Sequence, residues 1–179
     1  DKEREKFEQF FENFGIQLKY GVYDNFGADK DKLIDLLLYY SGTTESMTTL
    51  SDYVSRMEAD QKYIYYAAGE SKGKIQMMPQ MDLFKDKGYE VLYCTDNIDE
   101  FAFMAMREYE GKEFKNISDK DLGFEKTDAE IKAQEDKNEA AKDTLTAIKN
   151  ALGDKVSSVI LSTRLKNHPV CFATADGVS

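Results

Sequence analysis

The chain has little of what metal, redox or phosphate chemistry usually requires. Its 179 residues include one histidine and two cysteines, so a metal cluster built on histidines is excluded. Neither of the common glycine-rich phosphate patterns, G-x-G-x-x-G and G-x-x-x-x-G-K-[ST], occurs in it. Cys94 and Cys171 lie in apolar, strand-like runs, where reduced and packed thiols are expected rather than a disulfide. The sequence therefore offers no obvious catalytic constellation.

Positive charge and long apolar runs are also scarce. With 34 acidic and 24 basic residues the net charge is −10. Binding to nucleic acid or to an anionic membrane surface needs a basic face, so neither partner is expected. No stretch approaches the roughly 20 apolar residues of a membrane span, and no signal-peptide pattern opens the chain. We therefore expect a cytoplasmic protein.

The most informative stretch lies in the middle of the chain. Val91–Cys94 is a short unbroken apolar run, which is typical of a strand covered on both faces. The aromatic and β-branched segment Lys62–Ala68 predicts a second strand. A helix is expected between them, with a late start or an irregular opening turn at Pro79 and an end at Gly88. Strand, helix and strand in this order predict a parallel pair and an α/β fold.

The first 47 residues are expected to be helical. Phe7, Phe10, Phe11 and Phe14 follow a helical spacing, with Gly15 as the predicted end of that helix. A second helix is expected to run through Tyr40. The segment 114–117 is a candidate third strand further on.

The last third of the chain is charged before it becomes apolar again. Residues 119–142 have no steady apolar stripe, which is typical of a helix that bridges two folded parts in solvent. The apolar pattern resumes at Ala141 and ends at Gly153, and the runs 156–162 and 170–174 predict a β-hairpin. The expected architecture is α/β, or α+β taken as a whole, in four parts. These are a helical segment (1–47), a small α/β/α sandwich (48–122), a charged connector (123–143) and the truncated start of a second α+β domain (144–179).

Three acids follow the central strand and allow two interpretations. Asp96, Asp99 and Glu100 stand where ligands bind in open α/β sheets, and carboxylates there can hold Mg²⁺. A small metal-binding or phosphotransfer domain using Asp96 and Asp99 is therefore one hypothesis. The other is that all three acids favour the start of the next helix by capping and charge. Two weaker candidates are the turn at 69–72, as an anion cradle or an ordinary serine cap, and His168, as an exposed loop residue.

Several motifs together resemble the middle domain of the heat-shock protein 90 chaperones. They occur in order over nearly the whole chain: Asp52-Tyr53-Val54-Ser55-Arg56-Met57, Ile64-Tyr65-Tyr66, Gly69-Glu70-Ser71, Gly88-Tyr89-Glu90-Val91-Leu92 and Thr95-Asp96-Asn97-Ile98-Asp99-Glu100. The segment 152–156 is similar to the start of the family's C-terminal domain, and 167–171 resembles the bacterial, HtpG-type branch.

The resemblance implies a fragment of an ATP-dependent chaperone that binds partly folded proteins. The family's ATP and Mg²⁺ site, its catalytic arginine and its dimerising helices would all lie outside this piece. We therefore expect no catalytic, cofactor or metal residue here, no enzymatic activity of the fragment, and a monomeric fragment of a homodimeric parent. Domain coupling and contact with clients or co-chaperones would be its share of the function. A plain scaffold without client contact is the third hypothesis.

The helix after the central strand is the expected client contact. At about 100° per residue, Ile98, Ala102, Ala105 and Tyr109 share one face, which we assign to the sheet. Phe101 lies at the edge of that face, and Phe103 and Met104 point away from it. Either neighbouring elements cover these side chains, or they remain open to clients. The resemblance favours Phe101, with Glu100 beside it, as the open contact, whereas coverage is preferred for Phe103 and Met104. The client-binding hypothesis as a whole contains Glu100, Phe101, Phe103 and Met104.

Overall fold

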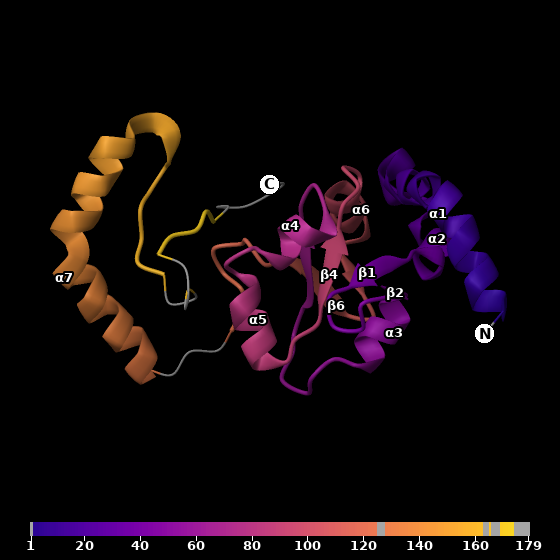
Figure 1. Cartoon of the computed structure of the whole chain (residues 1–179), viewed down its shortest axis with the longest axis horizontal. Coiled ribbons are helices and arrows are strands. Elements are labelled where there is room, and N and C mark those ends of the chain that lie inside the picture. The colour runs from indigo at the N-terminus through magenta and orange to yellow at the C-terminus, as the bar shows by residue number, and fades with distance from the viewer. Residues whose placement is uncertain (1, 125–127, 163–164, 166–168, 174–179) are drawn as a thin grey trace. The chain divides into compact units, whose positions relative to one another are not determined.

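The computed structural model describes residues 2–124, 128–162, 165 and 169–173. They form two compact units, the first from the described parts of 1–123 and 171–179 and the second from that of 124–170. The first unit contains a six-stranded mixed sheet with helices on both faces (Figure 1). The predicted α/β class is therefore confirmed. The predicted four-part division of the chain remains a prediction.

The sheet has the strand order β2-β1-β4-β3-β6-β5. Its strands are β1 (Tyr39–Ser41), β2 (Met47–Thr48), β3 (Ile64–Ala68), β4 (Val91–Cys94), β5 (Glu108–Tyr109) and β6 (Lys112–Asn116). β3 runs parallel to β4 on one side and to β6 on the other, whereas β1 is antiparallel to β4. The predicted parallel pair and the third strand are both confirmed.

Helices connect the strands. They are α1 (Lys2–Tyr23), α2 (Lys30–Leu33), α3 (Leu50–Ser55), α4 (Lys72–Gln76), α5 (Met81–Lys87), α6 (Asp99–Met106) and α7 (Asp128–Leu152), with 3-10 turns η1 (Asp24–Gly27), η2 (Ile34–Leu36) and η3 (Gly153–Lys155). The crossover from β3 to β4 contains two helices, α4 and α5, with Pro79 between them, rather than the single predicted helix with a late or irregular start. Gly88 ends α5 with a φ of 70°, a left-handed conformation that glycine adopts without strain.

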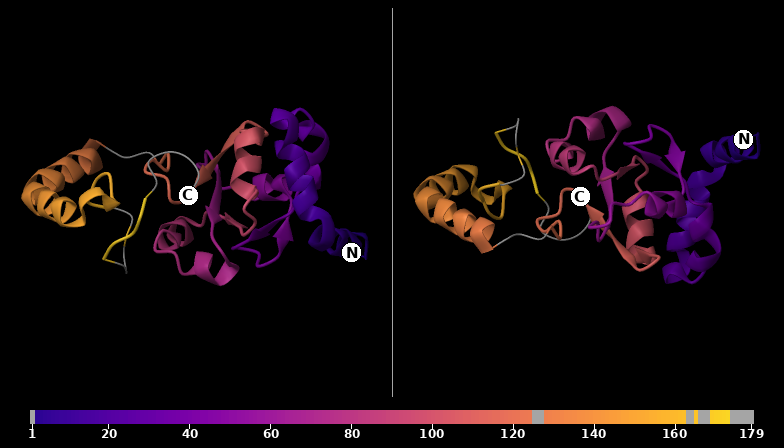
Figure 2. Two further views of the ribbon diagram at one scale, coloured as in Figure 1. Left: turned by 90° about the horizontal axis from the view of Figure 1, so that it is seen from above. Right: turned by 90° about the horizontal axis from the view of Figure 1, so that it is seen from below.

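The central strands bury both of their faces. Tyr66 of β3 points toward α6, where its ring centroid lies 4.7 Å from that of Phe103. Its neighbour Tyr65 points to the opposite face, 4.7 Å from the ring of Phe84 in α5. Figure 1 accordingly shows α4 and α5 on one side of the sheet and α1 and α6 on the other, and Figure 2 shows α1 and α6 side by side. Burial on both faces explains why the strand sequences are continuously apolar.

The N-terminal region differs from the all-helical prediction in two places. α1 continues through Gly15, where the ring of Phe11 lies 2.5 Å from the place a Cβ would take, so this glycine makes room for a side chain instead of ending the helix. The helix predicted through Tyr40 ends at Leu33, with η2 reaching Leu36. The next residues form β1, because pairing with β2 and β4 satisfies their backbone groups.

A buried tyrosine fastens α3 to the central strands. The Tyr53 hydroxyl donates to the Glu90 carbonyl at 2.8 Å and accepts from the amide of Tyr65 at 2.9 Å and from Gln61 Nε2 at 2.8 Å. Burial raises the pKa of Tyr53, so the hydroxyl stays protonated. The Glu90 carboxylate in turn receives two bonds from the Arg56 guanidinium, at 2.8 and 3.0 Å. The Tyr53 hydroxyl therefore acts both as a donor and as an acceptor to buried groups.

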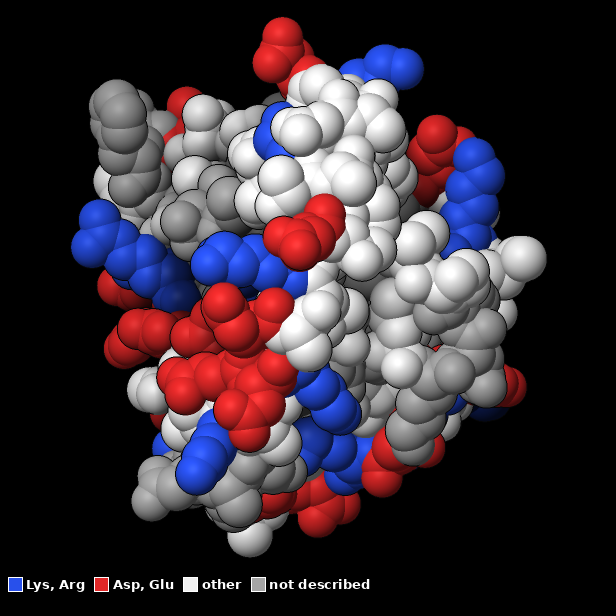
Figure 3. All heavy atoms as spheres, turned by 90° about the vertical axis from the view of Figure 1, so that its left-hand side faces the viewer, with Lys and Arg blue, Asp and Glu red and all other residues white. Residues whose placement is uncertain are grey.

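The second unit consists mainly of α7. Residues 128–143 of the predicted connector belong to this one helix, which ends at Leu152, directly before Gly153 as predicted. Figure 3, which views the molecule from the side of α7, shows acidic and basic side chains intermixed on that face. Residues 156–162 and 170–173 form no strand and have no sheet partner among the described residues, so the hairpin prediction is wrong for them, while residue 174 lies outside the described part. His168 lies outside the described residues.

None of the helices that the structure describes combines the length and the apolar character needed to cross a membrane.

We expect Tyr53→Phe to lower the free energy of unfolding by about 2–4 kcal/mol, because the substitution leaves buried donors and an acceptor unpaired. Urea unfolding followed by circular dichroism measures the change. Tyr20→Phe is the matched control, since Tyr20 is exposed and should change stability by less than about 0.5 kcal/mol. Equal effects of the two substitutions would contradict the role assigned to Tyr53.

Candidate functional site

The helix predicted to contact clients begins five residues after β4. α6 packs Ala102, Phe103 and Met106 against the sheet, and all three side chains are buried. On its outer side Phe101 is 39% exposed and Met104 is 59% exposed. α6 therefore has one buried face and one open apolar face.

Two of the four predicted client residues are not accessible. Phe103 is 2% exposed and stacks on Phe114 of β6, with ring centroids 4.3 Å apart. Glu100 is buried as well, and its Oε1 accepts from Asn116 Nδ2 at 2.8 Å. The prediction that Phe103 points away from the sheet is therefore wrong.

The reason is the short length of α6. Arg107 has a φ of 67° and stops the helix, so Tyr109 lies on β5 and cannot share a helical face with Ile98. The sheet covers the stripe of Asp99, Ala102, Phe103 and Met106 instead. This stripe has the i, i+3, i+4, i+7 spacing of a single helical face.

The open side of α6 continues onto α1. The ring of Tyr23 meets the ring of Phe101 edge-on, with centroids 5.7 Å apart, and the Tyr23 side chain is also exposed. Tyr20, one turn earlier, is exposed too. Sequence analysis missed this contribution of α1, although two tyrosines near the end of a polar helix were a visible signal.

The acids after β4 form an ion cluster with α1. Lys19 Nζ lies 2.8 Å from Asp96 Oδ2 and 2.6 Å from Asp99 Oδ1, and both Lys19 and Asp99 are almost fully buried. Asp99 Oδ2 also accepts the backbone amide of Asp96 at 3.1 Å. Burial lowers the pKa of Lys19, but the two carboxylates outweigh that effect and its pKa lies above the ordinary value. The ammonium group is therefore charged.

This cluster bears on both hypotheses for the three acids. The Lys19 ammonium occupies the position between the carboxylates that a bound cation would take. Asp96 is used for this ion pair, and no side chain caps the first turn of α6, so the simple capping hypothesis is wrong for Asp96. Among the described residues no group of three or more His, Cys, Asp or Glu side chains could hold a metal ion. The structure gives no support to a metal-binding domain.

The turn after β3 is an ordinary helix start. The Ser71 side chain accepts the backbone amide of Lys74 at 3.3 Å and so caps α4, as the simpler hypothesis predicted. Glu70 pairs with the Lys74 side chain. The serine and the acid of this turn are both occupied.

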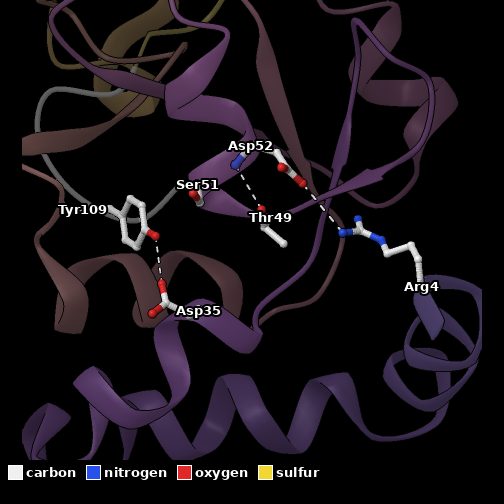
Figure 4. A pocket seen from close by; sticks show the side chains of 6 residues that line it. All are labelled: Arg4, Asp35, Thr49, Ser51, Asp52 and Tyr109. Carbon is white, nitrogen blue, oxygen red and sulfur yellow. Dashed lines mark hydrogen bonds and ion pairs between the residues drawn. The ribbon is translucent and has the colours of Figure 1, made fainter. Parts of the chain in front are cut away.

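A polar hollow lies between α1, η2, α3 and β5 (Figure 4). Its carboxylates already have partners: the Tyr109 hydroxyl donates to Asp35 Oδ1 at 2.8 Å, and Asp52 lies 3.6 Å from the Arg4 guanidinium. Burial and the neighbouring Asp35 raise the pKa of Tyr109 to about 12. With these groups paired, the hollow presents neither a free base nor an activated nucleophile.

Comparisons with known proteins define the class. The family described as "Hsp90 protein" matches residues 1–179. The "Chaperone protein HtpG" of Clostridium acetobutylicum is 53% identical over 171 residues, which cover 96% of this chain and 27% of that protein. The protein of the same name from Bacillus subtilis is 51% identical over 176 residues, covering 98% of this chain and 28% of that protein.

The mixed sheet and the open apolar helix described above thus belong to a class of proteins whose named relatives are chaperones. The chain belongs to the Hsp90 family and is similar to the bacterial HtpG type. It spans between a quarter and a third of the length of these relatives. The resemblance found in the sequence motifs is confirmed.

We expect Lys19→Met to lower the free energy of unfolding by about 3–5 kcal/mol, because it leaves Asp99 buried without a counter-charge. Burial already raises the pKa of Asp99 and Lys19 opposes that rise. Without Lys19 the folded state takes up a proton more readily than the unfolded state, so the deficit should shrink as the pH falls from 7 toward 5. Denaturant unfolding at both pH values measures this.

The control is Lys6→Met, which removes an exposed ion pair with Glu3 and should change stability by less than about 1 kcal/mol. A Lys19→Met deficit that grows on acidification would contradict the assignment of Asp99 as the stranded group.

Proposed function

We propose that this part of the chaperone contributes a contact surface for partly folded proteins, formed by Phe101 and Met104 of α6 with Tyr23 of α1. The observation that supports it best is the 39% exposure of Phe101 beside a tyrosine that is also open. Covering a large apolar side chain is worth about 1.5–3 kcal/mol, so leaving several of them in water has a cost that a binding role explains.

The chemistry of the surface suits varied partners. Methionine is flexible and polarisable and adapts to different apolar shapes. Tyrosine and phenylalanine provide large contact area with few rotatable bonds. Glu100 belongs to this proposal only as a support, because its carboxylate holds Asn116 beneath the surface.

The role of the whole protein is also a proposal. By family resemblance the parent is an ATP-dependent, homodimeric chaperone of the cytoplasm, with its ATP and Mg²⁺ site upstream of this chain. This piece would couple the neighbouring domains, contact clients and co-chaperones, and be a monomer by itself. The metal-binding alternative has no observation in its favour.

Phe101→Ala should weaken binding of a partly folded client by about tenfold or less, the effect of removing one apolar anchor. It should change the melting temperature little, because the side chain is partly open. Binding is measured by fluorescence anisotropy with a labelled, destabilised model protein. Phe10→Ala is the matched control, since Phe10 is similarly exposed on α1 but lies away from α6.

Two results would contradict the proposed client surface. One is a much lower melting temperature with unchanged client affinity per folded molecule, which would make Phe101 a core residue. The other is an equal loss of affinity in the Phe10→Ala control, which would indicate general apolar adhesion. A plain scaffold domain would show no client binding even in the unmodified chain.

The fragment by itself should neither bind nor hydrolyse ATP. The family's nucleotide site lies upstream by resemblance, and the sequence contains neither of the common glycine-rich phosphate patterns. Isothermal titration calorimetry with Mg-ATP, together with a phosphate-release assay, tests this expectation. Micromolar binding to the isolated chain would overturn it.

A further inference from the structure

A second cavity of the first unit is lined by residues of α1 further along the helix than Arg4 of the polar hollow. Its volume is about 230 Å³, and it is lined by α1, β1, the ends of β2 and β4, and the first residue of α4. Because β1 runs antiparallel to β4, the start of β1 meets the carboxyl end of β4 here. The carboxyl ends of parallel strands are where ligands bind in open α/β sheets.

The walls of this cavity are aromatic and already hold cations of the chain. Lys72 Nζ lies 3.7 Å from the ring centroid of Tyr40, and Lys19 Nζ lies 4.9 Å from that of Tyr39. Ammonium groups are attracted to the faces of such rings. Lys19 is fully engaged by its two carboxylates, whereas Lys72 is exposed and can leave the Tyr40 ring.

Two polar groups in the lining are unused. The Tyr39 side chain is buried, yet its hydroxyl has no hydrogen-bond partner among the described residues. The exposed Glu12 carboxylate forms no ion pair within the same part of the chain. Of the two, Glu12 is the accessible acceptor, because the Tyr39 hydroxyl is closed to solvent and its ring lies on the other face of β1 from that of Tyr40.

The charged side chains of the lining favour a ligand of positive charge. Lys19 and Lys72 stand against Glu12 and Asp96 in the lining, so once Lys72 leaves the Tyr40 ring the remaining groups carry a net charge of −1, in a chain whose net charge is −10. Ile16, Leu38 and Met47 supply apolar walls between the charged groups. The complement is an apolar stem that ends in a planar cation with several N–H donors.

We propose that this cavity binds an arginine side chain of an extended polypeptide. The guanidinium stacks on the Tyr40 face in place of Lys72 and donates to Glu12, while its methylene stem lies against Ile16 and Met47. This proposal depends on the proposed function in one respect, namely that the partner is a polypeptide. It concerns a site separate from the surface around Phe101.

The probe is the peptide acetyl-Ala-Ala-Arg-Ala-Ala-amide, added to the isotope-labelled chain and followed by NMR chemical shifts. Its partner peptide carries citrulline, which keeps the shape of arginine but has no charge. We expect the arginine peptide to shift the amides of Tyr39, Tyr40 and Asp96, with an affinity about tenfold above that of the citrulline peptide. Equal affinities, or shifts elsewhere on the surface, would overturn the proposal.

Two exposed positions give variants that should fold normally. Lys72→Ala uncovers the Tyr40 ring and should strengthen arginine-peptide binding about threefold, while the control Lys74→Ala in the same helix should not. Glu12→Gln should weaken binding about threefold, and Glu5→Gln should not. Weaker binding in Lys72→Ala would show that the lysine itself holds the ligand, which contradicts the proposed exchange of cations.

The variant Phe101→Ala separates this proposal from the client surface. It should leave the affinity for the arginine peptide unchanged. Loss of client binding in Phe101→Ala with intact arginine binding supports both proposals. Absence of arginine binding in the unmodified chain removes this one alone.

Discussion

One buried ammonium group determines how the first helix meets the sheet. Lys19 of α1 reaches Asp96 and Asp99 at the junction of β4 and α6, and Asp99 also accepts the Asp96 amide. A buried charge without a partner costs several kcal/mol, so the fold does not tolerate the loss of Lys19 or of Asp99, the two members of the cluster that are almost fully buried. The same cluster therefore fixes the turn before α6 and the position of α1. The placement of Phe101 and of its neighbour Tyr23 depends on both.

Local signals made the centre of the fold predictable. The four residues of β4 form an unbroken apolar run, and Gly88 ends α5 in the left-handed conformation that its type favours. The N-terminal region was not predictable in the same way. Tyr39 and Tyr40 continue a helical pattern in sequence, and only pairing with β2 and β4 makes them a strand. That pairing is a tertiary effect, which overrides a weak local preference.

The site was predictable in part for a similar reason. Asp96 and Asp99 were recognised as important, but their partner lies 77 residues from Asp96 in the sequence. A signal was available, since Lys19 shares the buried face of α1 with Phe11, Gly15 and Val22. A lysine on an apolar stripe indicates a buried counter-charge. Phe103 was wrongly assigned to the open face of α6. The helix ends where Arg107 adopts a positive φ, and no glycine in the sequence indicates that end.

The way α1 is attached explains why so much of it is open. An ion cluster specifies an orientation but adds little net stability compared with apolar packing of the same volume. α1 needs only the narrow face of Phe11, Gly15, Lys19 and Val22 to be held in register, so its flanks are left uncovered. One flank carries Tyr20 and Tyr23 beside Phe101, and the helix also forms a wall of the aromatic cavity. α1 is attached by an ion cluster and a narrow buried face rather than by extensive burial. A helix attached in this way can present two different surfaces, one apolar and one selective for charge.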